Sequence, residues 1–376
     1  MSDFLTRNKY FDELCNTEGL LWMGQNTNHI PTHPHVEETM IASIRAGEFH
    51  AYAPPLGFEA LREAIVSDLG VSGVEAVVTE GGVNALAMIC RARCRPGTTL
   101  VTTDPTWKWP GLFARQEGAE VIEIPIYDPR THYKLTPEAL EQAVDDRTAI
   151  IYIVDPNNPL GICYDADEIA AFSEIARKHD ALLVHDCTYR DFASAHHPVL
   201  KVTTENAIVS LSFSKWLGLA GLRIGAFIAG KSLAEEIASF ATGVLGASVI
   251  AQRAALAGLA VKREWMQQVR SIDDANKSKL KEAMEKAGFT VPVYPSNGNF
   301  LVVETVTAGI RPEALVACCK KEGIMIRQGT YHTQRFGDRF IKVSTTVPAS
   351  WVDRLCERLP ALVEAARQVN DVEPQF

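Results

Sequence analysis

The chain has 376 residues, with 37 basic and 46 acidic side chains and a net charge of −9. This length exceeds what one hydrophobic core usually supports, so it predicts two domains. The acidic balance, without any basic run, argues against a nucleic-acid-binding surface.

The chain also lacks the signals of a membrane protein or a metalloprotein. The amino terminus is charged within its first few residues, and the most apolar long run, 243–260, is interrupted by a glutamine and an arginine. We therefore expect a cytoplasmic protein with no membrane segment. Eight scattered cysteines indicate free thiols. His29, His33 and His35 lie in an irregular loop without a matching carboxylate or cysteine pattern, so we expect no metal site.

The amino-terminal part reads as helices separated by irregular segments. Residues 1–18 predict an amphipathic helix, whose apolar side carries Phe4, Leu5, Phe11 and Leu14. Helical patterns at 36–46 and 59–69 flank a stretch rich in proline and glycine, and this stretch presents Tyr52 on a loop.

Between residues 74 and 230, apolar runs alternate with helical patterns. Strands are expected at 76–79, 99–103, 120–125, 148–154, 181–185, 207–211 and 225–229. Helices are expected at 83–93, 109–117, 137–144 and 165–179. The alternation predicts an α/β fold whose seven-stranded, mostly parallel sheet is covered on both faces. Ligands bind at the carboxyl ends of such strands, so functional residues should follow the apolar runs.

The most unusual residue after an apolar run is Lys215. Ser212 and Ser214 precede it, and Arg223 follows on a loop that contains glycines. A lysine partly desolvated beside another cation loses its proton more readily and attacks aldehydes. The hydroxyls and the arginine suit a phosphate. Together they describe a Schiff base with pyridoxal 5′-phosphate (PLP), and the alternative is a surface lysine on a loop.

Residues after two earlier runs fit the same cofactor. Gly81, Gly82 and Val83 open a helix, and a helix N-terminus favours an anion, although two glycines equally suit a plain tight turn. Trp107 follows the second run, where an indole can cover one face of a planar ring, with core packing as the alternative.

The fourth and fifth runs end in polar side chains. Asn158 lies in a turn, where its amide can donate a hydrogen bond to a phenolate-type oxygen. Asp186 ends the fifth run, and a buried carboxylate is costly unless it meets a cation or a hydrogen-bond donor. A protonated pyridine nitrogen is such a partner, and the pairing keeps the ring electron-withdrawing. Tyr189 follows closely enough to share the site.

Past residue 230 the pattern changes. Long helical patterns cover 232–259 and 262–286, and a smaller α+β unit follows with strands at 300–304, 324–327 and 340–344 and helices at 312–322 and 350–368. We expect an amino-terminal segment (1–40) that packs with the small domain, a large PLP-binding domain (41–270) and a small domain (271–376).

These motifs, in this order over about residues 20–350, resemble the class I/II aminotransferases, which are fold type I PLP enzymes of the aspartate aminotransferase superfamily. The resemblance implies that Lys215 anchors the cofactor and then moves the proton between Cα and the cofactor. It implies that Asn158 and Tyr189 bind the phenolic oxygen, that Trp107 stacks on the ring and that Asp186 pairs with the pyridine nitrogen. The phosphate would be held by Arg223, Ser212, Ser214 and the backbone amides of Gly81, Gly82 and Val83. It also implies a homodimer, in which Tyr52 reaches the neighbouring active site.

One position departs from that family. Lys342 stands where the family usually has an arginine that grips the substrate carboxylate through two bonds, and lysine does not replace arginine in such a grip. Either Lys342 holds the carboxylate more loosely, or a neighbour takes over, or the substrate is unusual. The candidate neighbours are Arg327, Arg335 and Arg339. Loops at 20–30 and 327–337 are expected to line the substrate pocket and offer Trp22, Asn26, Tyr331, His332 and Arg335.

We therefore expect an aminotransferase that moves an amino group between an amino acid and a 2-oxo acid by a ping-pong route. The alternative is a PLP-dependent lyase, a decarboxylase or a specialised-pathway enzyme on the same fold, because fold does not determine the reaction. The absence of a GxGxxG motif argues against a nicotinamide dehydrogenase. The short acidic amino terminus leaves no room for the DNA-binding module of a PLP-dependent regulator.

Overall fold

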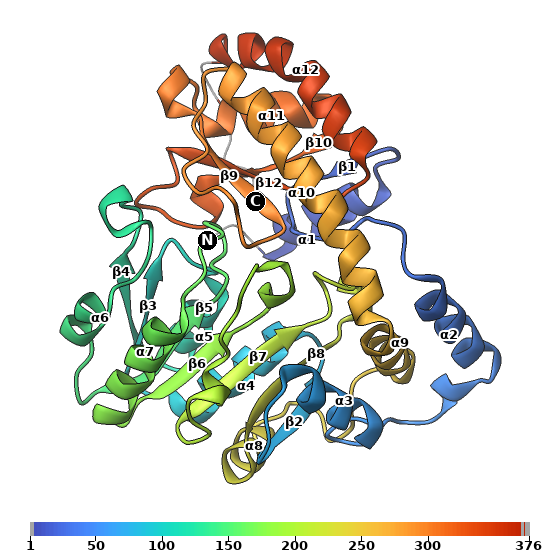
Figure 1. The fold of residues 1–376 in the computed structure, drawn as a ribbon, viewed down its shortest axis with the longest axis vertical. Helices are drawn as coiled ribbons and strands as arrows, with labels where there is room; N and C mark the ends of the chain where they lie inside the picture. Colours follow the sequence, from blue (N-terminus) through green and yellow to red (C-terminus); the bar gives the residue numbers. More distant parts are fainter. Residues whose placement is uncertain (1–3, 370–371, 373–376) are drawn as a thin grey trace. The chain divides into compact units, whose positions relative to one another are not determined.

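A computed structural model describes residues 4–369 and residue 372, and the chain divides into two compact units. The large unit comprises 30–270 and 295–298, and the small unit comprises 1–29, 271–294 and 299–376. Residues 30–40 thus belong to the large unit, whereas the sequence places them with the amino-terminal segment. The reason is that α2 (Pro34–Arg45) packs against α9 (Val249–Ala260) (Figure 1).

A seven-stranded sheet forms the centre of the large unit, in the order β2-β8-β7-β6-β5-β3-β4. Its strands are β2 (Val74–Thr79), β3 (Thr99–Asp104), β4 (Glu120–Pro125), β5 (Thr148–Val154), β6 (Leu182–Asp186), β7 (Ala207–Ser212) and β8 (Gly225–Gly230). β8 runs antiparallel to β2 and β7, and the other neighbouring pairs are parallel. The structure thus confirms the predicted α/β fold with a mostly parallel seven-stranded sheet.

Helices cover both faces of this sheet because the chain reverses its direction across the strands. The helices are α3 (Glu59–Leu69), α4 (Gly82–Arg93), α5 (Trp109–Gln116), α6 (Pro137–Ala143), α7 (Ala166–Lys178) and α8 (Lys231–Ala238). The crossovers through α4 and α5 move toward β4, and those through α6 and α7 move back. Right-handed crossovers then place the two pairs on opposite faces.

Local chemistry explains where these helices begin. In α7, the side chain of Asp165 accepts a hydrogen bond from the backbone N–H of Glu168 at 2.9 Å, and the Glu168 side chain accepts one from the backbone N–H of Asp165 at 2.7 Å. This capping box fixes the amino terminus of the helix. Ile169, Phe172 and Ala176 then recur at helical spacing and are buried against the sheet side.

One prediction about a helix was wrong. The pattern at 232–259 predicted one helix, but residues 239–248 separate α8 from α9, because this segment contains two glycines and ends in a helix cap. The hydroxyl of Ser248 accepts a hydrogen bond from the backbone N–H of Ala251 at 3.4 Å.

The helix expected at 1–18 is present as α1 (Phe4–Asn16), and residues 1–3 lie outside the described part. Leu14 is buried, but Phe4 and Leu5 are 78% and 72% exposed. The apolar cluster that α1 joins contains Leu14, Leu20 and Met325 and lies at the other end of the helix.

The small unit contains two short sheets. β11 (Arg327–Gln328), β12 (Phe340–Ser344) and β9 (Phe300–Glu304) form an antiparallel sheet in that order, and β1 (Leu21–Trp22) pairs in parallel with β10 (Ile324–Met325). The helices are α11 (Pro312–Lys321), α12 (Ala349–Arg367) and the second part of α10 (Lys262–Lys286), which begins in the large unit. They enclose one core, which includes Met284, Leu301, Val303, Leu315, Ile341 and Leu355. Among the described residues, no helix combines the length and apolarity needed to cross a bilayer.

Candidate active site

Four residues singled out in the sequence lie at one edge of the large unit's sheet. β3, β5, β6 and β7 are successive neighbours and run in the same direction, so their carboxyl ends meet at this edge. Trp107 follows β3, Asn158 follows β5, Asp186 ends β6 and Lys215 follows β7. β8 runs the opposite way and begins at the same edge, two residues after Arg223. Distant segments of the chain therefore contribute to one site.

The amino terminus of α4 and the start of β8 are packed closely enough to require glycine. A Cβ atom at Gly225 would lie 2.4 Å from the amide nitrogen of Gly82 and 2.8 Å from the carbonyl oxygen of Leu211. Gly81 has a φ of 83°, and a Cβ atom there would lie 2.6 Å from Nη2 of Arg223. The glycines thus allow an arginine side chain to approach the first turn of a helix.

This arrangement fits a phosphate group. The N–H groups of Gly82 and Val83 belong to the first turn of α4 and have no acceptor within the helix, so they favour an anion. The N–H of Gly81 instead donates to the carbonyl oxygen of Thr79 at 2.8 Å, so Gly81 contributes space rather than a donor. Arg223 adds a positive charge beside these amides. We call Gly81, Gly82, Val83 and Arg223 the phosphate cradle.

Serines of β7 and the loop after it border the cradle. An ideal Cβ atom on Gly82 would lie 3.5 Å from Cβ of Ser212 and 3.6 Å from Oγ of Ser210, so both serines lie close to the start of α4. The Oγ atom of Ser212 accepts a hydrogen bond from the backbone N–H of Ser214 at 3.2 Å. Ser210 is fully buried, and its hydroxyl has no hydrogen-bond partner. Ser210 lies inside the apolar run, so the sequence pattern does not single it out.

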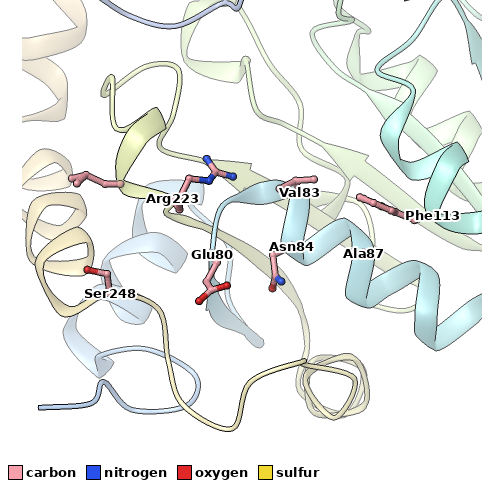
Figure 2. A pocket seen from close by; sticks show the side chains of 8 residues that line it. Glu80, Val83, Asn84, Ala87, Phe113, Arg223 and Ser248 are labelled. Carbon is pink, nitrogen blue, oxygen red and sulfur yellow. The ribbon is translucent and has the colours of Figure 1, made fainter. Parts of the chain in front are cut away.

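A cavity of about 600 Å³ opens beside the cradle (Figure 2). Val83 and Arg223 line it, together with Glu80, Asn84, Ala87, Phe113, Leu222 and Ser248. In Figure 2 the guanidinium of Arg223 points toward the amino end of α4, where Val83 lies. Two members of the phosphate cradle, Val83 and Arg223, thus form part of the cavity wall.

Lys215 has an amine that is easily deprotonated. Burial lowers the pKa of Lys215 to about 8, the positive charge of Arg223 acts in the same direction, and the carboxylate of Asp186 opposes the shift. A larger fraction of the amine is therefore neutral at physiological pH than for an exposed lysine. This is the state that attacks an aldehyde.

Asp186 provides a buried negative charge at the end of β6. Its Oδ1 atom accepts a hydrogen bond from the backbone N–H of Thr188 at 3.1 Å, and its Oδ2 atom accepts one from the hydroxyl of Tyr152 at 2.9 Å. Burial raises the pKa of Asp186 above its ordinary value, although hydrogen bonds from Thr188 and Tyr152 lower it. A cation at this position would relieve the cost of burial, and a protonated ring nitrogen has the required charge.

The loop after β5 assigns different tasks to its two asparagines. The side-chain oxygen of Asn157 accepts a hydrogen bond from the backbone N–H of Leu160 at 3.0 Å, and its backbone N–H donates to the carbonyl oxygen of Ile162 at 2.8 Å. Asn157 therefore shapes the turn. Asn158 is buried within this turn, at the position that the sequence assigns to the phenolic oxygen.

A buried cluster below the site invites a metal interpretation. The ligand atoms of His185, Cys187 and His196 lie within 4.8 Å of one another, and Oδ2 of Asp155 lies 3.1 Å and 3.2 Å from Nε2 of the two histidines. However, Nδ1 of His185 accepts the backbone N–H of Val199 at 3.1 Å. Its Nε2 atom therefore carries the proton and donates it to Asp155, which leaves no lone pair there for a metal.

This cluster instead ties together the ends of β5 and β6. Burial raises the pKa of Asp155, but hydrogen bonds from His185 and His196 outweigh it and hold the pKa well below the ordinary value. The other carboxylate oxygen of Asp155 accepts the backbone N–H of Tyr164 at 3.0 Å. The ionised Asp155 thus fixes both ends of the loop that carries Asn158.

Three aromatic residues of the large unit complete the predicted set. Trp107 is half-buried in the loop between β3 and α5, and Tyr189 is buried just after β6. Tyr52 is 85% exposed on its loop. Tyr52 therefore does not pack in the core of its own chain.

Of the predicted substrate-binding residues, Asn158 lies in the large unit, and Trp22, Arg327 and Lys342 lie in the small unit. Arg327 and Lys342 are directly opposite each other on β11 and β12, and they are only 3% and 2% exposed. The guanidinium of Arg327 lies 4.6 Å from the ring of Tyr331, and its Nη1 atom is buried without a hydrogen-bond partner. Arg339 forms an ion pair with Glu304 at 3.2 Å.

The remaining members of that set lie on neighbouring segments of the small unit. Trp22 is half-buried in β1, with its ring 6.4 Å from that of His29. Asn26 is buried with a φ of 55°, and its backbone N–H donates to Oγ of Ser344 at 2.8 Å. The 20–30 loop is therefore tied to the strand that carries Lys342.

The sequence profile described as "Aminotransferase class I and II" matches residues 18–359. The chain belongs to this aminotransferase family. The histidinol-phosphate aminotransferase of Geobacillus sp. (strain WCH70) is 30% identical over 333 residues, which cover 85% of this chain and 86% of that protein. The histidinol-phosphate aminotransferase of Methanosarcina mazei is 29% identical over 345 residues, which cover 90% of this chain and 88% of that protein.

Solved structures of aminotransferases share the fold. N-succinyldiaminopimelate aminotransferase from Mycobacterium tuberculosis superposes with a TM-score of 0.84 at 23% identity, covering 94% of this chain and 96% of its own. Aspartate aminotransferase from Thermus thermophilus with maleate superposes with a TM-score of 0.83 at 23% identity, and the match covers 96% of this chain and 97% of that protein. The expected family and fold are thus confirmed. The chain is a transferase, and its cofactor is PLP.

The charge around Lys215 leads to a testable pH dependence. We expect cofactor-free protein to capture pyridoxal, which lacks the phosphate, at a rate that rises as the pH increases through about 8. The amine reacts only after it loses its proton, so this midpoint reports its pKa. Arg223→Gln removes a like charge and should move the midpoint upward, whereas Arg223→Lys should leave it low. A wild-type midpoint near that of an exposed lysine would contradict the assignment.

Proposed function

We propose that this protein is an aminotransferase that moves an amino group between an amino acid and a 2-oxo acid in two half-reactions, with PLP held on Lys215 as a Schiff base. The observation that carries the proposal is the position of Lys215. Its amine, with a lowered pKa, lies at the same sheet edge as the phosphate cradle and the buried carboxylate of Asp186. Those three features match the aldehyde, the phosphate and the ring nitrogen of PLP.

Each residue of the large unit then has a defined task. Bound PLP supplies an electron sink for chemistry at the substrate Cα. The cradle would hold the phosphate, Asp186 would hold the ring nitrogen, and Asn158 and Tyr189 would hold the phenolic oxygen. Trp107 would cover one face of the ring. Lys215 would move the proton at the substrate Cα, because its pKa lies close to working pH.

Incubation with PLP tests this proposal. We expect the protein to gain the visible absorbance of bound PLP, and borohydride reduction to add the mass of the cofactor at Lys215. Lys215→Ala should gain no fixed mass, while its thermal midpoint should stay close to that of the parent. No added mass at Lys215 in the parent protein would overturn the proposal.

The same preparation distinguishes transamination from the alternative lyase or decarboxylase. With an amino donor and no 2-oxo acid, an aminotransferase converts its PLP stoichiometrically to the pyridoxamine form and stops. A lyase or decarboxylase instead releases ammonia or carbon dioxide over many turnovers. The presence of Lys342 keeps this alternative open.

We further propose that Arg327 and Lys342 together bind an anionic group of the substrate. The two positions are buried and directly opposite each other, and burial of the Arg327 guanidinium, whose Nη1 atom has no hydrogen-bond partner, is costly unless an anion joins it. Nη1 of Arg327 has an unused donor, whereas Arg339 is engaged by Glu304. The group is a carboxylate or a phosphate, and histidinol phosphate, for which the curated relatives are named, carries the latter.

Substitution of Arg327 tests this anion site. A hydrogen bond to a charged group contributes roughly 1.5–3 kcal/mol, so Arg327→Met should lower kcat/KM about 10- to 100-fold. The loss should appear with glutamate or histidinol phosphate, whichever is the better donor, and should be small with the matching amine that lacks the anion. Arg339→Met is the matched control and should change kcat/KM less than about twofold. Equal losses in both variants would contradict the assignment.

We also propose a homodimer in which Tyr52 enters the neighbouring active site. Gly246 donates its N–H to the carbonyl oxygen of Ala53 at 3.2 Å, which brings exposed Val244 and Leu245 close to exposed Tyr52. Such contiguous apolar exposure is typical of a protein interface. The cavity beside the cradle would receive Tyr52 of the partner subunit.

Hybrid dimers test this arrangement. Lys215→Ala and Tyr52→Ala should each lower activity strongly. Co-refolding them in equal amounts should restore activity to about a quarter of the parent value, because half of the dimers then contain one intact site. If Tyr52 serves its own subunit, every site keeps one defect and no activity returns.

A further inference from the structure

The phenol of Tyr152 lies beside the carboxylate of Asp186 inside the sheet. In the parallel pair of β5 and β6, Val154 is opposite Asp186 and Tyr152 is opposite Val184, so Tyr152 and Asp186 are diagonal neighbours on one face. The Tyr152 hydroxyl donates to Oδ2 of Asp186 at 2.9 Å. Both side chains are almost completely buried, at 1% and 3% exposed.

Packing alone does not explain a tyrosine here. The strand reads TAIIYIV, and a phenylalanine would fill the same volume without bringing a polar group into the interior. A buried phenol requires a partner, and Asp186 is the one it has. Burial and the negative charge of Asp186 raise the pKa of Tyr152 well above its ordinary value, so the hydroxyl keeps its proton and remains a donor.

The two hydrogen bonds to Asp186 also leave acceptor capacity for a donor from the cofactor's ring. Thr188 bonds Oδ1 of Asp186 through its backbone N–H, and Tyr152 bonds Oδ2. A carboxylate oxygen accepts more than one hydrogen bond, so the site edge of Asp186 can still receive a further donor. A side chain held at both oxygens cannot rotate away from that donor.

We propose that Tyr152 is a positioning residue for the ring nitrogen of the cofactor: by bonding Oδ2, it fixes the orientation of the Asp186 carboxylate and keeps it ionised. This inference rests on the proposed function. Tyr152 touches Asp186 rather than the substrate, and it acts through that carboxylate. It thereby determines how completely the ring nitrogen stays protonated and how strongly the ring withdraws electrons.

Tyr152→Phe tests this role, with Tyr164→Phe as its matched control. Tyr164 is equally buried in the large unit, but its oxygen accepts the backbone N–H of Leu135 at 3.3 Å and does not bond Asp186. Each variant removes one buried hydroxyl. We expect Tyr152→Phe to weaken PLP binding roughly five- to thirtyfold and Tyr164→Phe to leave it within about twofold.

Nitrogen NMR of protein loaded with isotope-labelled PLP gives a readout independent of activity. In Tyr152→Phe the ring-nitrogen signal should move toward that of neutral pyridine, and in Tyr164→Phe it should stay in place. In an Asp186→Asn background, Tyr152→Phe should cause no further loss of PLP affinity, because both changes act on one interaction. Equal signals in the two single variants, or additive losses with Asp186→Asn, would overturn the inference.

The outcomes separate this inference from the proposed function. If the parent protein fixes no PLP at Lys215, the proposed function fails. If the parent fixes PLP but Tyr152→Phe behaves like Tyr164→Phe, only the role of Tyr152 fails. Should Tyr152→Phe not fold, 3-fluorotyrosine at position 152 provides the test. Its hydroxyl is more acidic and donates more strongly, so the ring-nitrogen signal should move away from that of neutral pyridine. An unchanged signal would contradict the inference.

Discussion

The buried carboxylate of Asp186 is the constraint on which the site depends. It lies at the end of a central parallel strand, where desolvation opposes its charge. Donors from Thr188 and Tyr152 offset part of that cost, and a cation from the ligand would offset more. The negative charge of Asp186 is therefore only partly compensated within the protein, and a bound cofactor would complete the compensation. Binding energy for PLP is in this sense built into the fold before the phosphate or the aldehyde makes any contact.

Positive charge gathers at the opposite end of the same site. Arg223 lies against the glycines of the cradle, and Lys215 follows β7 nearby. Burial, together with repulsion from Arg223, lowers the pKa of Lys215, while the negative charge of Asp186 raises it. A dianionic phosphate would neutralise Arg223 and so reduce the repulsion. Phosphate binding beside Arg223 should therefore raise the pKa of the Lys215 amine relative to the cofactor-free protein.

Much of this arrangement follows from the sequence, because parallel strands bring their carboxyl ends to one edge. That rule brought Asn158, Asp186 and Lys215 to the same edge from their positions after apolar runs. Tyr152 was missed because it lies within such a run, and only the register with β6 reveals its partner. The break between α8 and α9 was missed because the apolar pattern continues through glycines 243 and 246. Periodicity reports which side chains seek burial, not where the backbone turns.

In the small unit, the effect of Lys342 depends on its cross-strand neighbour, Arg327. Lysine in place of arginine at position 342 removes a forked donor, but the register puts Arg327 directly opposite, on the adjacent strand. Directly opposite residues of an antiparallel pair project from the same face, so the two cations offer a point charge and a planar fork side by side. Carboxylate and phosphate oxygens each accept hydrogen bonds from more than one donor. An anion held here would therefore meet two positive charges on neighbouring strands in place of a single arginine fork.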